Sequence, residues 1–178
     1  MTDEQVIKKV AKGNIGLSMI LFKKYNGKVF SFYRYMGLSI EDAEDLTHEV
    51  FEKVIRSCGS FNLDKLFKPW LYQIMRSQLV DFRRVNGRTK YVNISEFDFK
   101  ETVDFEYDEI ELSKLNMALL ELPNHDRELI LLVKFQQLSY AEAATIFGIS
   151  EGAVKTRVHR IIHKLTDYFK KQYPNERD

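Results

Sequence analysis

Apolar residues recur at helical spacing, every three to four positions, along most of the chain. A strand pattern, in which apolar and polar residues alternate, is not convincing outside a short run at 91–94. The apolar stripes and the breaks between them predict helices at about 3–12, 15–36, 40–57, 69–84, 111–120, 126–135, 139–147 and 150–171. The predicted fold class is therefore all-α, and the helices are short enough that they must pack against one another.

Capping and breaking residues indicate where several of these helices start and stop. Gly37 ends the second helix, and Ser39 followed by Asp42 resembles a capping box that opens the third. Pro69 is expected to start the fourth helix, after a polar, glycine-containing loop at 58–68. The expected core positions of the third and fourth helices are Leu46, Val50, Phe51, Val54, Ile55, Leu71, Ile74, Met75, Leu79 and Phe82.

The distribution of charge is more informative than the net charge of +1. The stretch from Lys65 to Lys90 is basic, the stretch from Thr89 to Glu111 is acidic, and the segment from Ser150 to Lys171 is basic again. This order indicates two polyanion-binding units joined by an acidic connector, although ordinary solvated helix faces give a similar pattern. We therefore expect an N-terminal domain at 1–88, an acidic linker at 89–110 and a C-terminal domain at 111–173.

Composition narrows the possible classes of protein. Hydrophobic residues make up 44% and charged residues 30%, which is the balance of a soluble globular protein. The single cysteine, Cys58, excludes an intramolecular disulfide framework and a zinc site built from thiolate pairs, and it fits a reducing compartment. No apolar run reaches the ~20 residues that cross a bilayer, and residues 1–12 are too polar for a signal peptide. We expect a cytoplasmic protein without membrane insertion.

The most specific signal is a helix-turn-helix pattern, SYAEAATIFGISEGAVKTRVHRIIHKL at 139–165. Ser139 and Glu142 form a capping box for one short helix. Gly148 supplies a tight turn, and Ser150 caps the helix that follows. The residues expected to close the inner side of the corner are Ala144, Phe147, Ile149 and Val154. A major groove admits one helix and a second helix braces it across the backbone, so this pattern favours DNA binding.

The second helix of this motif has two contrasting faces. Winding it at about 100° per residue gathers an apolar core face of Val154, Val158, Ile161 and Leu165. The opposite face suits base edges and phosphates, and it consists of Gly152, Lys155, Thr156, His159, Arg160 and His163. Such corners also occur in proteins that never bind DNA. His159 and His163 lie four residues apart, but no third metal ligand is apparent nearby, so no metal or other cofactor is expected.

Three motifs, in this order, resemble those of the extracytoplasmic-function sigma factors of the sigma-70 family, which direct bacterial RNA polymerase to promoters. The segment at 41–54, EDAEDLTHEVFEKV, resembles the family's helix that binds core polymerase. The segment at 67–84, FKPWLYQIMRSQLVDFRR, resembles the helix that melts and captures the minus-ten promoter element. The segment at 138–160, LSYAEAATIFGISEGAVKTRVHR, resembles the domain that recognises the minus-thirty-five element. The resemblance implies promoter-specific transcription initiation, with core RNA polymerase and promoter DNA as partners and no enzymatic activity.

The resemblance also implies roles for individual residues. The contacts to the clamp helices of the largest polymerase subunit would come from Asp45, His48, Glu49 and Glu52. Those to the minus-ten element, including a pocket for an extruded base, would come from Phe61, Lys65, Phe67, Lys68, Trp70, Arg76, Ser77, Arg83 and Arg84. Those to the minus-thirty-five element would come from Gly152, Lys155, Thr156, Arg157, His159 and Arg160. Core packing is the alternative for Phe67 and Trp70.

The chain departs from the family pattern at two positions. His48 stands where the family usually has glutamine, and Ser77 stands where it usually has asparagine. Members of the family are commonly sequestered by an anti-sigma factor, so such a partner is expected here.

Two other classes of protein stay open beside a sigma factor, namely an operator-binding helix-turn-helix regulator and an interaction adaptor. An enzyme acting on DNA is disfavoured, because the carboxylates lie on a helix exterior and in the linker, away from a convergent His, Lys or nucleophile.

Overall fold

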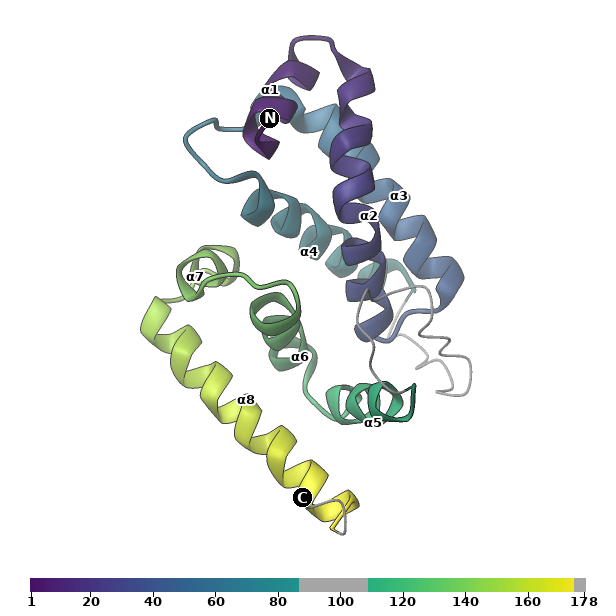
Figure 1. The fold of residues 1–178 in the computed structure, drawn as a ribbon, viewed down its shortest axis with the longest axis vertical. Coiled ribbons are helices and arrows are strands. Elements are labelled where there is room, and N and C mark those ends of the chain that lie inside the picture. Colours follow the sequence, from purple (N-terminus) through teal and green to yellow (C-terminus); the bar gives the residue numbers. More distant parts are fainter. Residues whose placement is uncertain (87–108, 175–178) are drawn as a thin grey trace. The chain divides into compact units, whose positions relative to one another are not determined.

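The computed structural model describes residues 1–86 and 109–174, and in these ranges the chain forms helices and turns without a β-strand (Figure 1). The prediction of an all-α fold is confirmed. The chain divides into two compact units, Met1–Val92 and Asn93–Asp178, each with its own buried apolar residues. Among the helices described, none combines the length and hydropathy needed to cross a membrane.

Helices α1 (Asp3–Ala11), α2 (Ser18–Tyr35), α3 (Ile40–Ser57) and α4 (Phe67–Asn86) form the first unit. Helix α3 packs against both α2 and α4, and α1 also contacts both α2 and α4. Figure 1 shows these four helices. The apolar stripes meet in one core, whose most deeply buried members include Ile7, Leu21, Val29, Phe32, Val50, Leu71 and Met75. Of the predicted core positions, Ile55 and Phe82 are only partly buried, because they lie at the edges of their stripes.

The predicted boundaries in this unit hold with two differences. Gly37 follows α2 with φ of 90°, and Ser39 caps α3 by accepting a hydrogen bond of 3.0 Å from the Asp42 amide. The stretch predicted as one helix from Ile15 begins instead with a short 3₁₀ turn, Ile15–Leu17 (η1). Helix α4 starts at Phe67, two residues before Pro69, because the Phe67 amide finds an acceptor outside its own helix.

Helices α5 (Glu109–Leu120), α6 (Asn124–Ile130), α7 (Tyr140–Phe147) and α8 (Glu151–Gln172) form the second unit. A π-helical segment, Leu131–Phe135 (η4), extends α6. Helix α8 contacts α5, α6 and α7 and is the longest element of this unit (Figure 1). The fully buried core of this second unit includes Leu119, Leu129, Ala143, Val154 and Ile161.

The second unit departs from the predicted boundaries at its start and in α6. Glu109 and Ile110, assigned to the linker, belong to α5. The rest of the predicted linker and the run at 91–94 lie outside the described residues. The helix predicted at 126–135 begins earlier, at Asn124, and ends in the wider π-helical turn. Gln137, with φ of 54°, terminates it where a break was predicted.

Candidate functional site

The predicted helix-turn-helix is formed by α7 and α8. Ser139 and Glu142 make the expected capping box at the start of α7. Gly148 takes a left-handed conformation with φ of 66°, which glycine adopts without steric cost. Ser150 then caps α8 by accepting a hydrogen bond of 3.2 Å from the Ala153 amide. Local chemistry therefore sets the angle at which α8 leaves the turn.

The two faces of α8 are separated as the helical period predicts. Val154, Val158 and Ile161 are almost completely buried, and Leu165 is partly buried. The side chains exposed to solvent on the other face include Gly152, Lys155, Thr156, His159, Arg160 and His163. The Thr156 hydroxyl donates to the Gly152 carbonyl at 3.0 Å, so its outward lone pairs can only accept. The His159 and His163 ring centroids lie 4.5 Å apart.

Arg157, a predicted minus-thirty-five contact, makes an ion pair within the second unit. Its Nε donates to Oδ1 of Asp126 at 2.7 Å, and Nζ of Lys164 lies 3.3 Å from Oδ2 of the same carboxylate. At about 100° per residue, Arg157 falls roughly 60° from Val154, at the edge of the core face. The helical period could therefore have assigned Arg157 to packing against α6.

The Asp126 carboxylate is a buried ionic contact that the sequence analysis missed. Asp126 is only 4% exposed, and this burial disfavours the ionised form of its carboxyl. The hydrogen bonds and charges of Arg157 and Lys164 outweigh that effect and hold the pKa of Asp126 below its ordinary value of 3.8. This contact attaches α8 to α6 and fixes the direction in which the exposed face of α8 points.

Arg127 is a second buried charge that the sequence analysis missed. Its side chain is completely buried, and its guanidinium donates to the carbonyls of Leu119 at 2.7 Å and Leu122 at 3.1 Å. These carbonyls belong to the last turn of α5 and the turn after it, where backbone acceptors have no intrahelical partner. Arg127 therefore caps α5 from α6, as a side-chain cation can at the C-terminus of a helix.

In the first unit, three predicted aromatic residues come together where the 58–68 loop meets α4. Ring centroids lie 5.0 Å apart for Phe61 and Trp70, 5.9 Å for Phe67 and Trp70, and 6.2 Å for Phe61 and Phe67. Phe67 is fully buried and Phe61 is 8% exposed, whereas Trp70 is partly exposed. Phe67 is thus a core residue, the alternative that the sequence left open. Trp70 is the ring that reaches the surface.

The outer surface of this loop combines the predicted Lys65 with two leucines that the sequence analysis did not single out. Leu63 and Leu66 are 46% and 57% exposed, and Lys65 beside them is also exposed. Together they offer apolar contact for an unstacked base and a charge for its phosphate. Two leucines within a polar loop, outside any helical stripe, were the available signal.

The predicted minus-ten residues of α4 are distributed over several sides of the helix. Ser77 and Arg84 are exposed, and Arg84 pairs with Asp81 at 3.2 Å. Lys68 and Arg76 are partly exposed. Arg83 turns toward the end of α2, where its Nη2 lies 3.5 Å from the Met36 carbonyl oxygen. The structure therefore leaves Arg84 accessible at the end of α4 and directs Arg83 into a packing contact.

The acidic face of α3 is exposed as predicted, and it carries Asp45, His48, Glu49 and Glu52. Glu49 accepts a hydrogen bond of 3.0 Å from Gln78, which itself accepts one of 3.0 Å from Lys53. Glu52 pairs with Arg56. The His48 ring stacks on Phe22 with centroids 6.5 Å apart, so an aromatic side chain of α2 borders the acidic face.

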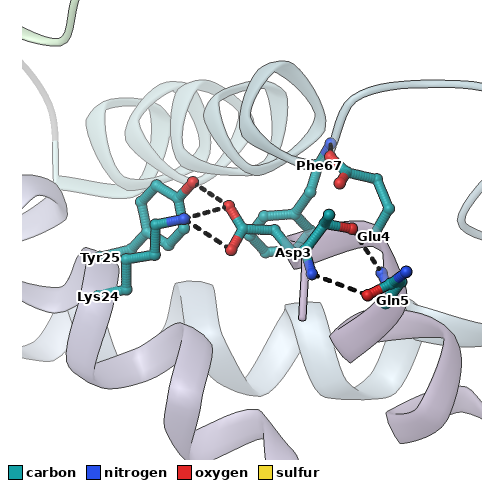
Figure 2. Close-up of polar contacts among 7 residues, drawn as sticks. Asp3, Glu4, Gln5, Lys24, Tyr25 and Phe67 are labelled. Carbon is teal, nitrogen blue, oxygen red and sulfur yellow. Dashed lines mark hydrogen bonds and ion pairs between the residues drawn. The ribbon is translucent and has the colours of Figure 1, made fainter.

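Helix α1 supports the start of α4 through a carboxylate. Figure 2 shows Oε1 of Glu4 next to the Phe67 amide, which donates a hydrogen bond of 2.9 Å. The amide holds the pKa of the Glu4 carboxyl below its ordinary value of 4.5, although partial burial acts the other way. Beside it, Asp3 accepts from Nζ of Lys24 at 2.8 Å and from the Tyr25 hydroxyl at 2.5 Å. Sequence reasoning could not find these contacts, because they join distant parts of the chain.

Clusters of three or more His, Cys, Asp or Glu side chains suited to a metal ion are not found among the described residues. The exposed surfaces instead offer cations, leucines and an aromatic edge in the first unit, and a polar cationic helix face in the second. These surfaces are suited to binding polyanions and proteins.

Each of the two units matches the model of a known protein family. Residues 21–89 match the model of sigma-70 region 2, and residues 112–165 match the model of sigma-70 region 4. The chain belongs to the extracytoplasmic-function sigma factors of the sigma-70 family. This sigma factor is 30% identical over 150 residues to the extracytoplasmic-function sigma factor SigM of Bacillus subtilis, covering 82% of the chain and 90% of SigM.

Two further proteins extend the comparison. The sigma factor NccH of Alcaligenes xylosoxydans is 28% identical over 176 residues, covering 92% of each chain. The sigma factor RpoE of Bartonella quintana, solved with the anti-sigma factor NepR, is 25% identical with a TM-score of 0.68, and the match covers 89% of this chain and 98% of RpoE. The general role of this sigma factor is promoter-directed transcription initiation, with core RNA polymerase and DNA as its partners. Its relatives are not enzymes.

Proposed function

We propose that this sigma factor reads the two promoter elements with separate surfaces. The exposed face of α8 binds the minus-thirty-five element in the major groove. The loop at 61–66 and the start of α4 capture an extruded base of the minus-ten element and so assist melting. The acidic face of α3 binds the clamp helices of the largest polymerase subunit. Each assignment uses side chains that are accessible in the described structure.

The observation that carries the proposal is the division of α8 into a buried and an exposed face. Val154, Val158 and Ile161 are fixed in the core, so the helix cannot rotate to present a different surface. Lys155 and Arg160 are then the long cations at the edges of a face whose centre is formed by smaller groups. Such a face lets the helix approach base edges closely while its cations reach guanines or phosphates.

Run-off transcription with core polymerase, the full-length protein and a promoter library tests this proposal. We expect transcripts only when this sigma factor is added, from templates that share an upstream and a downstream element. A requirement for a second sigma factor would instead favour the operator-binding regulator. Transcripts that share no upstream element would argue against reading by α8.

The loop assignment needs a sharper test, because Phe61 and Phe67 are core residues whose removal would cost stability. Replacing the exposed Leu63 and Leu66 with alanine avoids that cost. We expect weaker permanganate reactivity of the minus-ten element with unchanged binding of the closed duplex. Val80 and Val85, exposed at 57% and 78% on α4, provide the matched double alanine control. Equal effects of the two double variants would reject the loop as the capture site.

An anti-sigma protein is also proposed as a partner. The support comes from the related RpoE of Bartonella quintana, which was solved in complex with its anti-sigma factor NepR. A purified candidate should bind the free sigma factor, exclude core polymerase and suppress run-off transcription from the selected promoter. A candidate that binds the sigma factor but leaves transcription unchanged would not be its anti-sigma factor.

A further inference from the structure

Glu4 lies far from the loop in sequence but next to it in space. Its carboxylate accepts the Phe67 amide hydrogen across a separation of 63 residues, and Phe67 is both the first residue of α4 and the residue after the loop. The first amides of a helix have no partner within the helix, and negative charge is stabilising near them. Glu4 therefore acts as an N-terminal cap supplied by another helix.

The helix that supplies this cap is itself held firmly. Asp3 accepts from both Lys24 and Tyr25 of α2, and the Tyr25 ring packs against Phe67 with centroids 5.7 Å apart (Figure 2). Helix α1 also contacts the short turn Cys58–Ser60 (η2), where the loop begins. Both ends of the loop are thus in contact with α1. A movement of α1 would be passed to the loop at either end.

We infer that Glu4 is a positioning residue for capture of the minus-ten strand, because it fixes the start of α4 and with it the loop at 61–66. This inference rests on the proposed function of that loop. Glu4 contacts no base in this assignment; it acts through the Phe67 amide and the position of Leu66 and Trp70 beside it. The loop is then ready to accept an unstacked base without first ordering its own end.

A simpler role for Glu4 makes the opposite prediction. If Glu4 were only a negative charge near the path of a polyanion, removing it would strengthen DNA binding by reducing repulsion. If it positions the loop, removing it weakens binding of the single strand despite the more favourable charge. The sign of the change therefore separates the two roles.

The test uses full-length protein bound to core polymerase, with a fluorescent single-stranded oligonucleotide carrying the minus-ten sequence of a promoter selected in the run-off experiment. Glu4→Ala removes the acceptor, whereas Glu4→Gln keeps a neutral oxygen that the Phe67 amide can still reach. Gln5→Ala is the control on the same helix, because Gln5 forms the capping box of α1 with Thr2. Binding of upstream duplex and hydrogen exchange of peptides covering 61–70 are measured in parallel.

We expect Glu4→Ala to weaken single-strand binding roughly fivefold, which corresponds to the typical cost of losing one helix cap. Glu4→Gln should lose less, upstream duplex binding should stay unchanged, and exchange should rise within 61–70. Unchanged or stronger single-strand binding by both Glu4 variants would overturn the inference. Equal losses for Glu4→Ala and Gln5→Ala, or an equal loss of duplex binding, would overturn it too. Failure of the wild-type holoenzyme to bind the strand would instead reject the proposed function of the loop.

Discussion

Carboxylates from neighbouring helices brace α8 in one unit and α4 in the other, but they use different partners. Asp126 is almost fully buried and pairs with the side chains of Arg157 and Lys164. Glu4 is only partly buried, and its main partner is the backbone amide of Phe67. Loss of Asp126 leaves two cations without their acceptor, whereas water can replace Glu4 at the start of α4. The stability of the second unit therefore depends more strongly on charge, and in the first unit charge mainly positions a loop.

The largest effect in this comparison is expected from Arg127→Met. This change removes the guanidinium that donates to the carbonyls of Leu119 and Leu122 at the end of α5, and we expect it to lower the free energy of unfolding by about 3 kcal/mol. Lys134→Met, on the exposed side of η4, is the matched control and should change it by less than about 0.5 kcal/mol. Urea denaturation followed by circular dichroism measures both. Similar values for the two variants would show that buried charge does not stabilise this unit.

The next effect sharpens the division between packing and recognition on α8. Arg160→Ala and Lys155→Ala should each weaken DNA binding by about 1–3 kcal/mol if the side chain contacts guanine, with little change in stability. Arg157→Ala should instead lower stability by about 1 kcal/mol, because Asp126 loses its closer partner. Site selection and thermal unfolding with the three variants separate these outcomes. A loss of sequence preference confined to Arg157→Ala would contradict the assignment.

A pH series tests the Asp126 contact itself. Because the folded pKa of Asp126 lies below its ordinary value of 3.8, its carboxylate stabilises the fold above that pH, and the contribution is lost as the pH falls through the folded value. Asp126→Asn should therefore be less stable than the wild type at neutral pH, by about 1 kcal/mol, and the gap should narrow in acid. Exposed Asp167→Asn is the control. A gap that is constant from about pH 7 to pH 3 would contradict an ionic role for Asp126.

The smallest change in stability is expected on the acidic face of α3. Reversing charge at Asp45 and Glu49 to lysine should alter the free energy of unfolding by less than about 0.5 kcal/mol, since both side chains are exposed. Association with core polymerase should nevertheless weaken by about 1 kcal/mol or more, and the loss should depend on salt. Titration of labelled core polymerase measures it, with reversal of Glu41 and Glu44 on the same helix as the control. Equal binding by the two double variants would reject this face as the polymerase contact.

The features that the sequence predicted correctly are those that depend on neighbours along the chain. The faces of α8, the capping box at Ser139 and the turn at Gly148 follow from helical periodicity and local hydrogen bonds, so a single sequence contains them. The start of α4 does not, because its extension to Phe67 requires an acceptor from residue 4. The buried position of Phe67 had been one of two alternatives, since aromatic residues serve equally in cores and in base pockets.

The charged residues of the second unit were harder to predict for a related reason. Asp126 and Arg127 stand at the start of a helix, where charged residues are usually solvated. Only the packing of α6 against α8 and α5 makes one an ion-pair centre and the other a cap. Leu63 and Leu66 were missed because their signal, two leucines in a polar loop, is weak: single exposed leucines are common on protein surfaces.

The 63-residue separation between Glu4 and Phe67 also has a consequence in time. A chain is synthesised from its N-terminus at about 5–20 residues per second, so roughly 3 to 13 seconds pass between the appearance of Glu4 and that of its partner. Throughout that interval α1 has its carboxylate ready while α4 has not been made. Local contacts such as those of Arg127 with α5 span only 8 residues at most and close as soon as they are synthesised. The loop at 61–66 therefore acquires its final support from Glu4 only after most of the first unit has been synthesised.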